Sequence, residues 1–104
     1  MFLKYEINIK KEAVQSNLNR ITNQIYKLLP IREEGLDWKA PLATIIEELG
    51  GMSSLMEDKQ TTLFSLLCKL EGLFLLDSKE EFFTFRRTIF ECLNLIGRLI
   101  QTCQ

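Results

Sequence analysis

The chain has 104 residues, which is enough for one domain (1–104) but not for two separate hydrophobic cores. Hydrophobic residues make up 46% and charged residues 26%, with five glycines and two prolines, and this globular composition excludes a disordered chain. The formal net charge of −1 excludes the strong basic field that collects proteins on nucleic acid or anionic lipid, so we expect neither nucleic acid nor a membrane as a partner.

The first predicted helix follows a short segment with a different pattern. From Leu3 to Ile9 apolar and polar residues alternate as in a strand, but a lone strand has nothing to pair with in a helical chain. We therefore interpret residues 1–9 as an arm or an extended lead-in. A helical stripe with steps of four and three follows: Val14, Leu18, Ile21, Ile25 and Leu28. Pro30 is predicted to end this helix, because proline donates no backbone hydrogen bond and disfavours helical geometry in the residue before it.

A second helix is predicted after a charged connection. Asp37 is a suitable N-cap, and Pro41 falls in the first turn, where the missing donor costs little. Gly50 and Gly51 are predicted to end the helix. Its apolar stripe is Trp38, Leu42, Ile45 and Leu49. Trp38 is either part of that buried stripe, which its spacing favours, or an exposed anchor for a partner.

Two further helices are predicted at residues 59–76 and 79–101. Ser78 and Glu81 between them have the spacing of a capping box. Both helices carry more apolar residues than a bundle needs from one helix. The sequence therefore predicts an all-α fold, a small four-helix bundle with a long C-terminal antiparallel hairpin, which dimerisation is expected to complete.

The surplus apolar surface has two explanations: the helix at 59–76 lies in the centre of the bundle, or the surplus is covered by another protein. Because complete enclosure of one helix is hard to arrange in so small a chain, association with a protein is favoured. Contiguous exposed apolar patches usually mark interfaces, and burying them between two copies also stabilises a small core. We expect a homodimer that forms through surplus residues of the hairpin: Phe64, Leu67, Phe74, Phe83, Phe90 and Leu95. For a second, unidentified protein we expect the acidic segment 32–58 to be the docking surface, and in particular Arg32, Glu33, Glu34, Asp37 and Trp38.

The residue composition argues against a catalytic function. The absence of histidine removes the Ser-His-Asp and Cys-His nucleophile pairs and the usual metal ligands. Neither Cys68 nor Cys92 has a second thiol at the spacing of about two to four residues that metal sites use. Three cysteines, an odd number, suit reduced thiols, and no secretion signal or membrane-spanning run is found. We expect a cytoplasmic, non-enzymatic protein without cofactor or metal.

Two other functions stay open beside this interpretation. Residues 45–55 are similar to the first helix and turn of a helix-turn-helix, which implies a DNA-associated transcriptional regulator. The run Glu33-Glu34-Gly35-Leu36-Asp37 resembles half of the magnesium motif of all-helical nucleotide pyrophosphohydrolases, a family that completes its site with a second acidic segment on a facing helix. The favoured hypothesis is an adaptor, assembly factor or inhibitor of a larger protein, and the Lys, Asn, Ile and Leu bias suits an AT-rich bacterial or phage genome.

Overall fold

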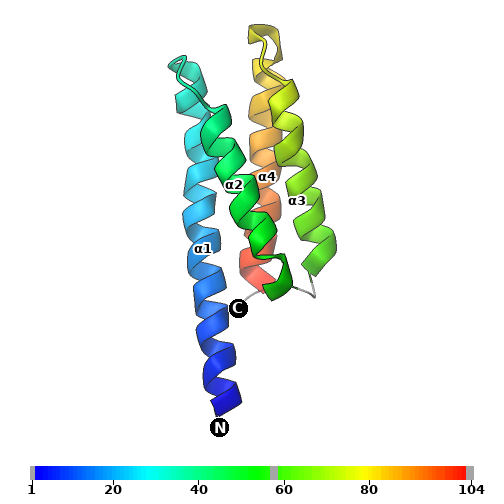
Figure 1. The fold of residues 1–104 in the computed structure, drawn as a ribbon. Helices are drawn as coiled ribbons and strands as arrows, with labels where there is room; N and C mark the ends of the chain where they lie inside the picture. Colours follow the sequence, from blue (N-terminus) through cyan, green and yellow to red (C-terminus); the bar gives the residue numbers. More distant parts are fainter. Residues whose placement is uncertain (1, 57–58, 103–104) are drawn as a thin grey trace.

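The fold consists of four α-helices packed together. The computed structural model describes residues 2–56 and 59–102, with side chains at 11–56 and 59–101, and it has no strand within these residues. The helices are α1 (Phe2–Glu33), α2 (Lys39–Gly51), α3 (Gln60–Gly72) and α4 (Phe82–Thr102), and short 3-10 turns lie at Ser53–Leu55 (η1), Leu73–Leu75 (η3) and Lys79–Glu81 (η4). The helices run alternately up and down (Figure 1). The prediction of an all-α fold of four helices is confirmed.

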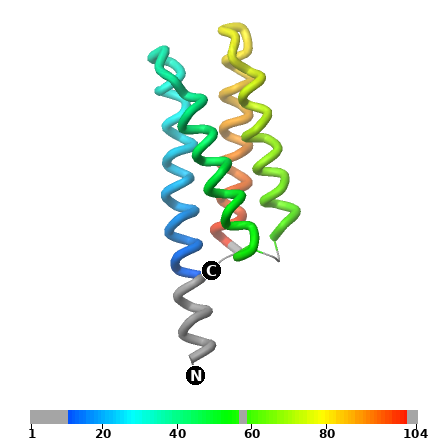
Figure 2. The backbone as a smooth tube through the Cα atoms, in the orientation of Figure 1, coloured from blue at the N-terminus to red at the C-terminus, as the bar shows by residue number. Residues whose placement is uncertain are grey.

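The helices enclose one core. Each packs against its neighbours in the chain, and α1 also packs against α4, so that α4 has its most extensive contacts with α3 and α1. The backbone trace shows the connections gathered at the two ends of the bundle (Figure 2). The predicted stripes of α1 and α2 are buried, and α4 contributes Phe85, Ile89, Cys92, Ile96 and Leu99. No described helix is both long and apolar enough to cross a membrane.

The ends of α1 differ from the sequence pattern. The helix begins at Phe2, and the side chains of residues 1–10, where we expected an arm or an extended lead-in, lie outside those that the structure describes. Pro30 lies inside the helix, so the prediction that it ends α1 is wrong. The helix continues because Leu28 and Leu29 are buried in the core and one further turn closes on the Pro30 carbonyl, which accepts a hydrogen bond from Glu34 N at 3.0 Å.

Gly35 is the residue that stops α1. Its φ of +76° lies in the left-handed region, which costs glycine little because it has no Cβ. Gly35 N donates to the Arg32 carbonyl and Leu36 N to the Ile31 carbonyl, both at 3.0 Å, which is the hydrogen-bond pattern of a Schellman motif. A glycine therefore sets the turn into α2, one turn later than the proline would have placed it.

We expect Gly35→Ala to lower the free energy of unfolding by about 1 kcal/mol, because an L side chain is strained at this φ. No atom lies within 4 Å of the added Cβ, so the loss is conformational and not a steric clash. Urea denaturation measures it. Gly50→Ala, which also meets no atom within 4 Å but lies inside the end of α2, is the matched control and should be neutral or stabilising. Equal effects of the two changes would contradict this account of the turn.

Side-chain caps were predicted at the starts of α2 and α4, and only the first of them is present in the structure. Asp37 Oδ1 accepts hydrogen bonds from Lys39 N at 3.0 Å and Ala40 N at 3.3 Å, so Asp37 caps α2 as predicted. Ser78 Oγ instead donates to Glu81 Oε1 at 2.7 Å and caps no backbone group. The first turn is therefore a 3-10 turn, closed by Glu81 N on the Ser78 carbonyl at 3.1 Å, and the α-helix proper begins at Phe82.

Candidate interaction surfaces

Arg32 joins three segments at the end of the bundle. It lies four residues after Leu28, at the end of the buried stripe of α1, so its side chain points into the space between the helices. Its Nη1 donates to the Leu76 carbonyl, and its Nη2 donates to the Ser78 carbonyl at 2.7 Å. A guanidinium on α1 thereby holds the connection between α3 and α4.

Aromatic rings surround the same guanidinium. The Arg32 Cζ lies 4.4 Å from the ring centroid of Phe85, 5.3 Å from that of Trp38 and 5.7 Å from that of Phe82. Trp38 and Phe85 also contact each other edge to face at 4.9 Å. Trp38 is only 8% exposed, so its indole belongs to the core cluster. The arginine is therefore stabilised by hydrogen bonds to carbonyls and by cation–π contacts together.

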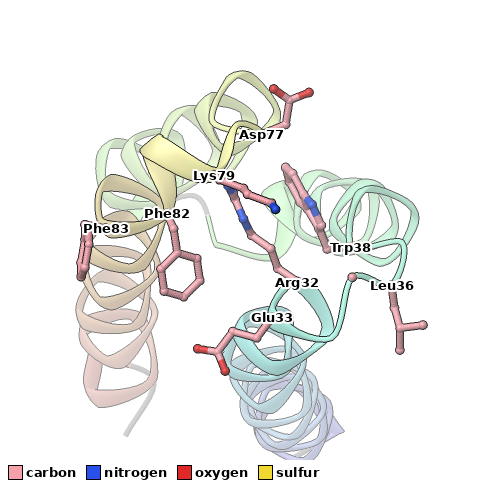
Figure 3. A pocket seen from close by; sticks show the side chains of 9 residues that line it. Arg32, Glu33, Leu36, Trp38, Asp77, Lys79, Phe82 and Phe83 are labelled. Atoms are coloured by element: carbon pink, nitrogen blue, oxygen red, sulfur yellow. The ribbon is translucent and has the colours of Figure 1, made fainter.

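A pocket of about 600 Å³ opens beside Arg32, and Glu33, Leu36, Lys79 and Phe83 contribute to its lining. Figure 3 shows the Arg32 side chain reaching between Trp38 and Phe82. Two of its donors are already bound to backbone carbonyls of this chain. The pocket wall thus serves first to close the end of the bundle.

We expect Arg32→Met to lower the free energy of unfolding by about 2 kcal/mol, because it removes two hydrogen bonds from a charged donor and the cation–π contacts but keeps an apolar side chain. Urea denaturation followed by the fluorescence of Trp38, the one tryptophan of the chain, measures the loss. Lys39→Met is the control: it removes an exposed ion pair beside the same indole, which solvent screens, and should cost clearly less than Arg32→Met. A loss for Arg32→Met no larger than for the control would contradict this role.

An exposed ion pair lies next to this cluster. Lys39 Nζ lies 3.1 Å from Asp77 Oδ2, and this hydrogen bond, with the lysine charge, holds the pKa of the Asp77 carboxyl below its ordinary value of 3.8. The unfolded chain therefore binds a proton at this residue before the folded chain does. The stabilisation is fully present above pH 3.8 and is lost as the pH falls through the lower, folded-state pKa.

We expect the stability of the native chain to fall more steeply below pH 3.8 than that of Asp77→Asn, which lacks this carboxyl. The effect should be small, because the pair is exposed and solvent screens it. Thermal unfolding at a series of pH values and low salt is the measurement. Glu80→Gln makes the same charge change at an exposed residue of η4 and serves as the control. Parallel pH profiles for the native chain and Asp77→Asn would refute the prediction.

A row of exposed aromatic rings lies where α1 meets α4, and we call Tyr26, Phe83 and Phe90 the aromatic face. Phe83 is 76% exposed, Tyr26 56% and Phe90 38%. Phe83 and Phe90 are seven residues apart, about two turns, and so share one side of α4. The rings of Tyr26 and Phe90 meet edge to face with centroids 6.4 Å apart, and Arg86 Cζ lies 5.3 Å from the Phe90 centroid. The contact between Tyr26 and Phe90 joins the two helices, and Phe83 lies about 10 Å further along the same side of α4.

A second apolar surface, the α3 face, consists of exposed Phe64 and Leu75 with half-buried Leu67 and Phe74. The ion pair between Lys69 and Glu91 marks the side on which α3 meets α4. At about 100° per residue, Phe64 lies about 140° around α3 from Lys69 and so points away from α4. The α3 face and the aromatic face therefore lie on different sides of the hairpin.

The structure thus divides the residues that we expected to mediate self-association. Phe83 and Phe90 lie together on the aromatic face, and Phe64, Leu67 and Phe74 lie together on the α3 face. Leu95, half-buried and packed against the core, is four residues after Glu91 and so on the side of α4 that meets α3. The hairpin carries two apolar surfaces in place of a single one.

The expected partner surface is also divided. Arg32, Glu33 and Trp38 line the pocket, but only Glu33 of these is exposed. Glu34 is exposed in the turn after α1, and Asp37 is exposed but engaged as the cap of α2. The charged end thus offers a solvent-facing carboxylate, Glu33, beside a buried aromatic cluster.

Among the described side chains, sequence reasoning missed four exposed large apolar residues: Tyr26, Leu36, Leu55 and Leu75. A signal for Tyr26 was present, since it is a large aromatic residue on an otherwise polar side of α1. Leu36 lies in the turn after α1, Leu55 in η1 and Leu75 in η3, and in such short segments periodicity carries no information about burial. The position of Tyr26 on the polar side of α1 therefore could have predicted an exposed ring.

The geometry also bears on the two other functions. No three Asp, Glu or Cys residues of the described segments come together as a metal site would require. A recognition helix of a helix-turn-helix would begin near Ser54, where the structure has the 3-10 turn η1, and α3 begins at Gln60.

Burial raises the pKa of the Cys92 thiol to about 12, which keeps it protonated.

Comparisons with protein-family models, with curated proteins and with solved structures gave no match for this chain. The class of the protein is therefore set by its own features, an all-α fold of four packed helices with two separate exposed apolar surfaces. Function has to be argued from those surfaces.

Proposed function

We propose that the protein is a non-enzymatic protein–protein interaction module that associates with a second copy through the aromatic face. The observation that carries this proposal is the exposure of Tyr26, Phe83 and Phe90 in one row over two packed helices. Aromatic residues with arginine are the residue types enriched at interfaces, and Arg86 stacks over Phe90 within this row. An adaptor, assembly factor or inhibitor of a larger protein would use such a face.

The energetics favour burial of the face. Burying a phenylalanine side chain contributes roughly 1.5–3 kcal/mol, and Phe83 alone leaves 76% of its surface in water. A twofold interface uses the same patch on both copies, so every ring counts twice. Scaled by their exposed fractions, the six rings of a dimer contribute roughly 5–10 kcal/mol, which is of the same order as the roughly 4–15 kcal/mol lost in translational and rotational freedom on association.

The α3 face supports a second role for the same module. Phe64 and Leu75 are exposed on a side of the hairpin that does not adjoin the aromatic face. A twofold contact through the aromatic face therefore leaves the α3 face open. We assign the α3 face to a different protein, so that the module joins a copy of itself to a partner.

The proposal predicts that Phe83→Ser weakens self-association at least 100-fold, a loss of about 2.7 kcal/mol at about 1.4 kcal/mol per factor of ten, because Phe83 is the most exposed ring of the face. Sedimentation velocity over a range of concentrations measures the dimerisation constant. Phe64→Ser is the matched control, since it removes an equally exposed ring from the α3 face and should leave the dimer intact.

Two results would overturn this proposal. One is a native chain that sediments as a monomer at every concentration up to about 100 μM. The other is a dimer that survives Phe83→Ser and is lost in Phe64→Ser, which would move self-association to the α3 face. Circular dichroism of each variant establishes that the helices are retained.

A further inference from the structure

Gly97 is the glycine of this chain that lies in the interior of a helix. Four of the five glycines lie at or just beyond helix ends, and Gly97 alone lies in the interior of a helix, α4. Glycine destabilises a helix interior relative to alanine, and proteins place it there when something packs closely against the backbone. A Cβ added at Gly97 would meet no atom within 4 Å, so none of the side chains that the structure describes occupies that space.

The position of Gly97 relates it to the aromatic face. Phe83, Phe90 and Gly97 are spaced seven residues apart, so they follow one side of α4 as two large side chains and a notch. Phe90 stands midway between the other two. In an antiparallel pair of identical helices centred on Phe90, residues whose numbers add up to 180 face each other, and Phe83 then faces Gly97 of the second copy.

We propose that two copies pair α4 against α4 in antiparallel orientation, about a twofold axis at Phe90, with the ring of each Phe83 seated on Gly97 of the other copy. This inference rests on the proposed self-association through the aromatic face and specifies its geometry. It explains why the most exposed of the described aromatic rings and the one mid-helix glycine lie on the same side of α4.

The polar groups along the line are compatible with this register. Arg86 faces Asn94 of the second copy, so the guanidinium meets an amide that can accept a hydrogen bond, and both residues are exposed. Arg87 faces Leu93, so neither arginine meets an arginine. Glu91 pairs with Lys69 on the side of α4 that adjoins α3, so its charge is compensated away from the axis.

The rings of the aromatic face supply less than half of the area that a standard interface buries. From their exposed fractions, the three rings of the aromatic face present roughly 350 Å² per copy, taking about 200 Å² for a free ring. Standard interfaces bury about 800 Å² per partner. The helix α4 has 21 residues and is about 32 Å long, and the proposed pairing requires the remaining area to come from α4 beyond the rings and from the adjoining side of α1.

Cysteine cross-linking tests the register directly. Arg86→Cys and Asn94→Cys are made separately, in a chain whose exposed Cys68 and whose Cys103, which lies outside the described residues, are changed to serine; Phe83, Phe90 and Gly97 stay native. A short bismaleimide should join the two variants when they are mixed, at least 10-fold more than it joins either alone. Cross-linking of Arg86→Cys to itself indicates parallel helices and overturns the inference, as does the absence of any cross-link.

Substitution of the notch gives a second, independent measurement. Gly97→Leu should weaken dimerisation at least 100-fold, since a side chain fills the site of the Phe83 ring, yet raise the Tm of the dilute monomer by about 4 °C, since leucine favours the helix. Gly72→Leu, at the end of α3 and equally free of neighbours within 4 Å, should change dimerisation less than 3-fold. A dimer that is unaffected by Gly97→Leu overturns the inference.

The outcomes separate this inference from the proposal on which it rests. If Phe83→Ser dissociates the dimer but Gly97→Leu does not, and no cross-link forms between positions 86 and 94, self-association through the aromatic face stands and the α4 register falls. If the native chain is monomeric throughout, both fall. Analytical sedimentation and cross-linking on the full chain are sufficient to decide between these cases.

Discussion

The hydrogen bonds from Arg32 to the Leu76 and Ser78 carbonyls fix how the two halves of the bundle meet. The guanidinium extends from the last turn of α1, and the carbonyls belong to the connection between α3 and α4. Phe85 of α4 packs against the same guanidinium, so the start of α4 is held beside the end of α1. The aromatic face depends on this arrangement, since Tyr26 comes from α1 and Phe83 and Phe90 come from α4. An arginine at the end of an apolar stripe therefore supports a surface elsewhere on the molecule.

The sequence was sufficient for the elements whose cause is local. Stripes such as Val14 to Leu28 are buried because residues three and four apart share a helix face, and Asp37 caps α2 because its side chain reaches the first free N–H groups. Pro30 was misjudged because its local cost is offset by the burial of Leu28 and Leu29 and by the closing turn at Gly35. Tertiary packing outweighed a local preference there.

The surfaces could not be derived from periodicity alone. An apolar residue off the main stripe of a helix is exposed or half-buried according to which neighbour covers it, and the sequence does not state which helix lies on which side. The Lys69–Glu91 pair and the Tyr26–Phe90 contact place α3 and α1 on opposite flanks of α4. Phe64 and Phe83 look equivalent in the sequence. The placement of the neighbouring helices is needed to assign them to separate surfaces. Arg32, which looked like a solvent-facing charge, is likewise engaged with backbone on another segment.

The separation of the two apolar surfaces by α4 has a consequence for how strongly a target is held. In the proposed twofold pair through the aromatic face, the two α3 faces would both be directed away from the axis. A target with two matching sites then meets the second α3 face at a high effective concentration once the first is bound, so that two contacts of modest strength give long-lived capture. A target with a single site gains nothing from the pairing. The module would in this way discriminate between assembled and isolated forms of the same target by valency, with no change in its binding surface.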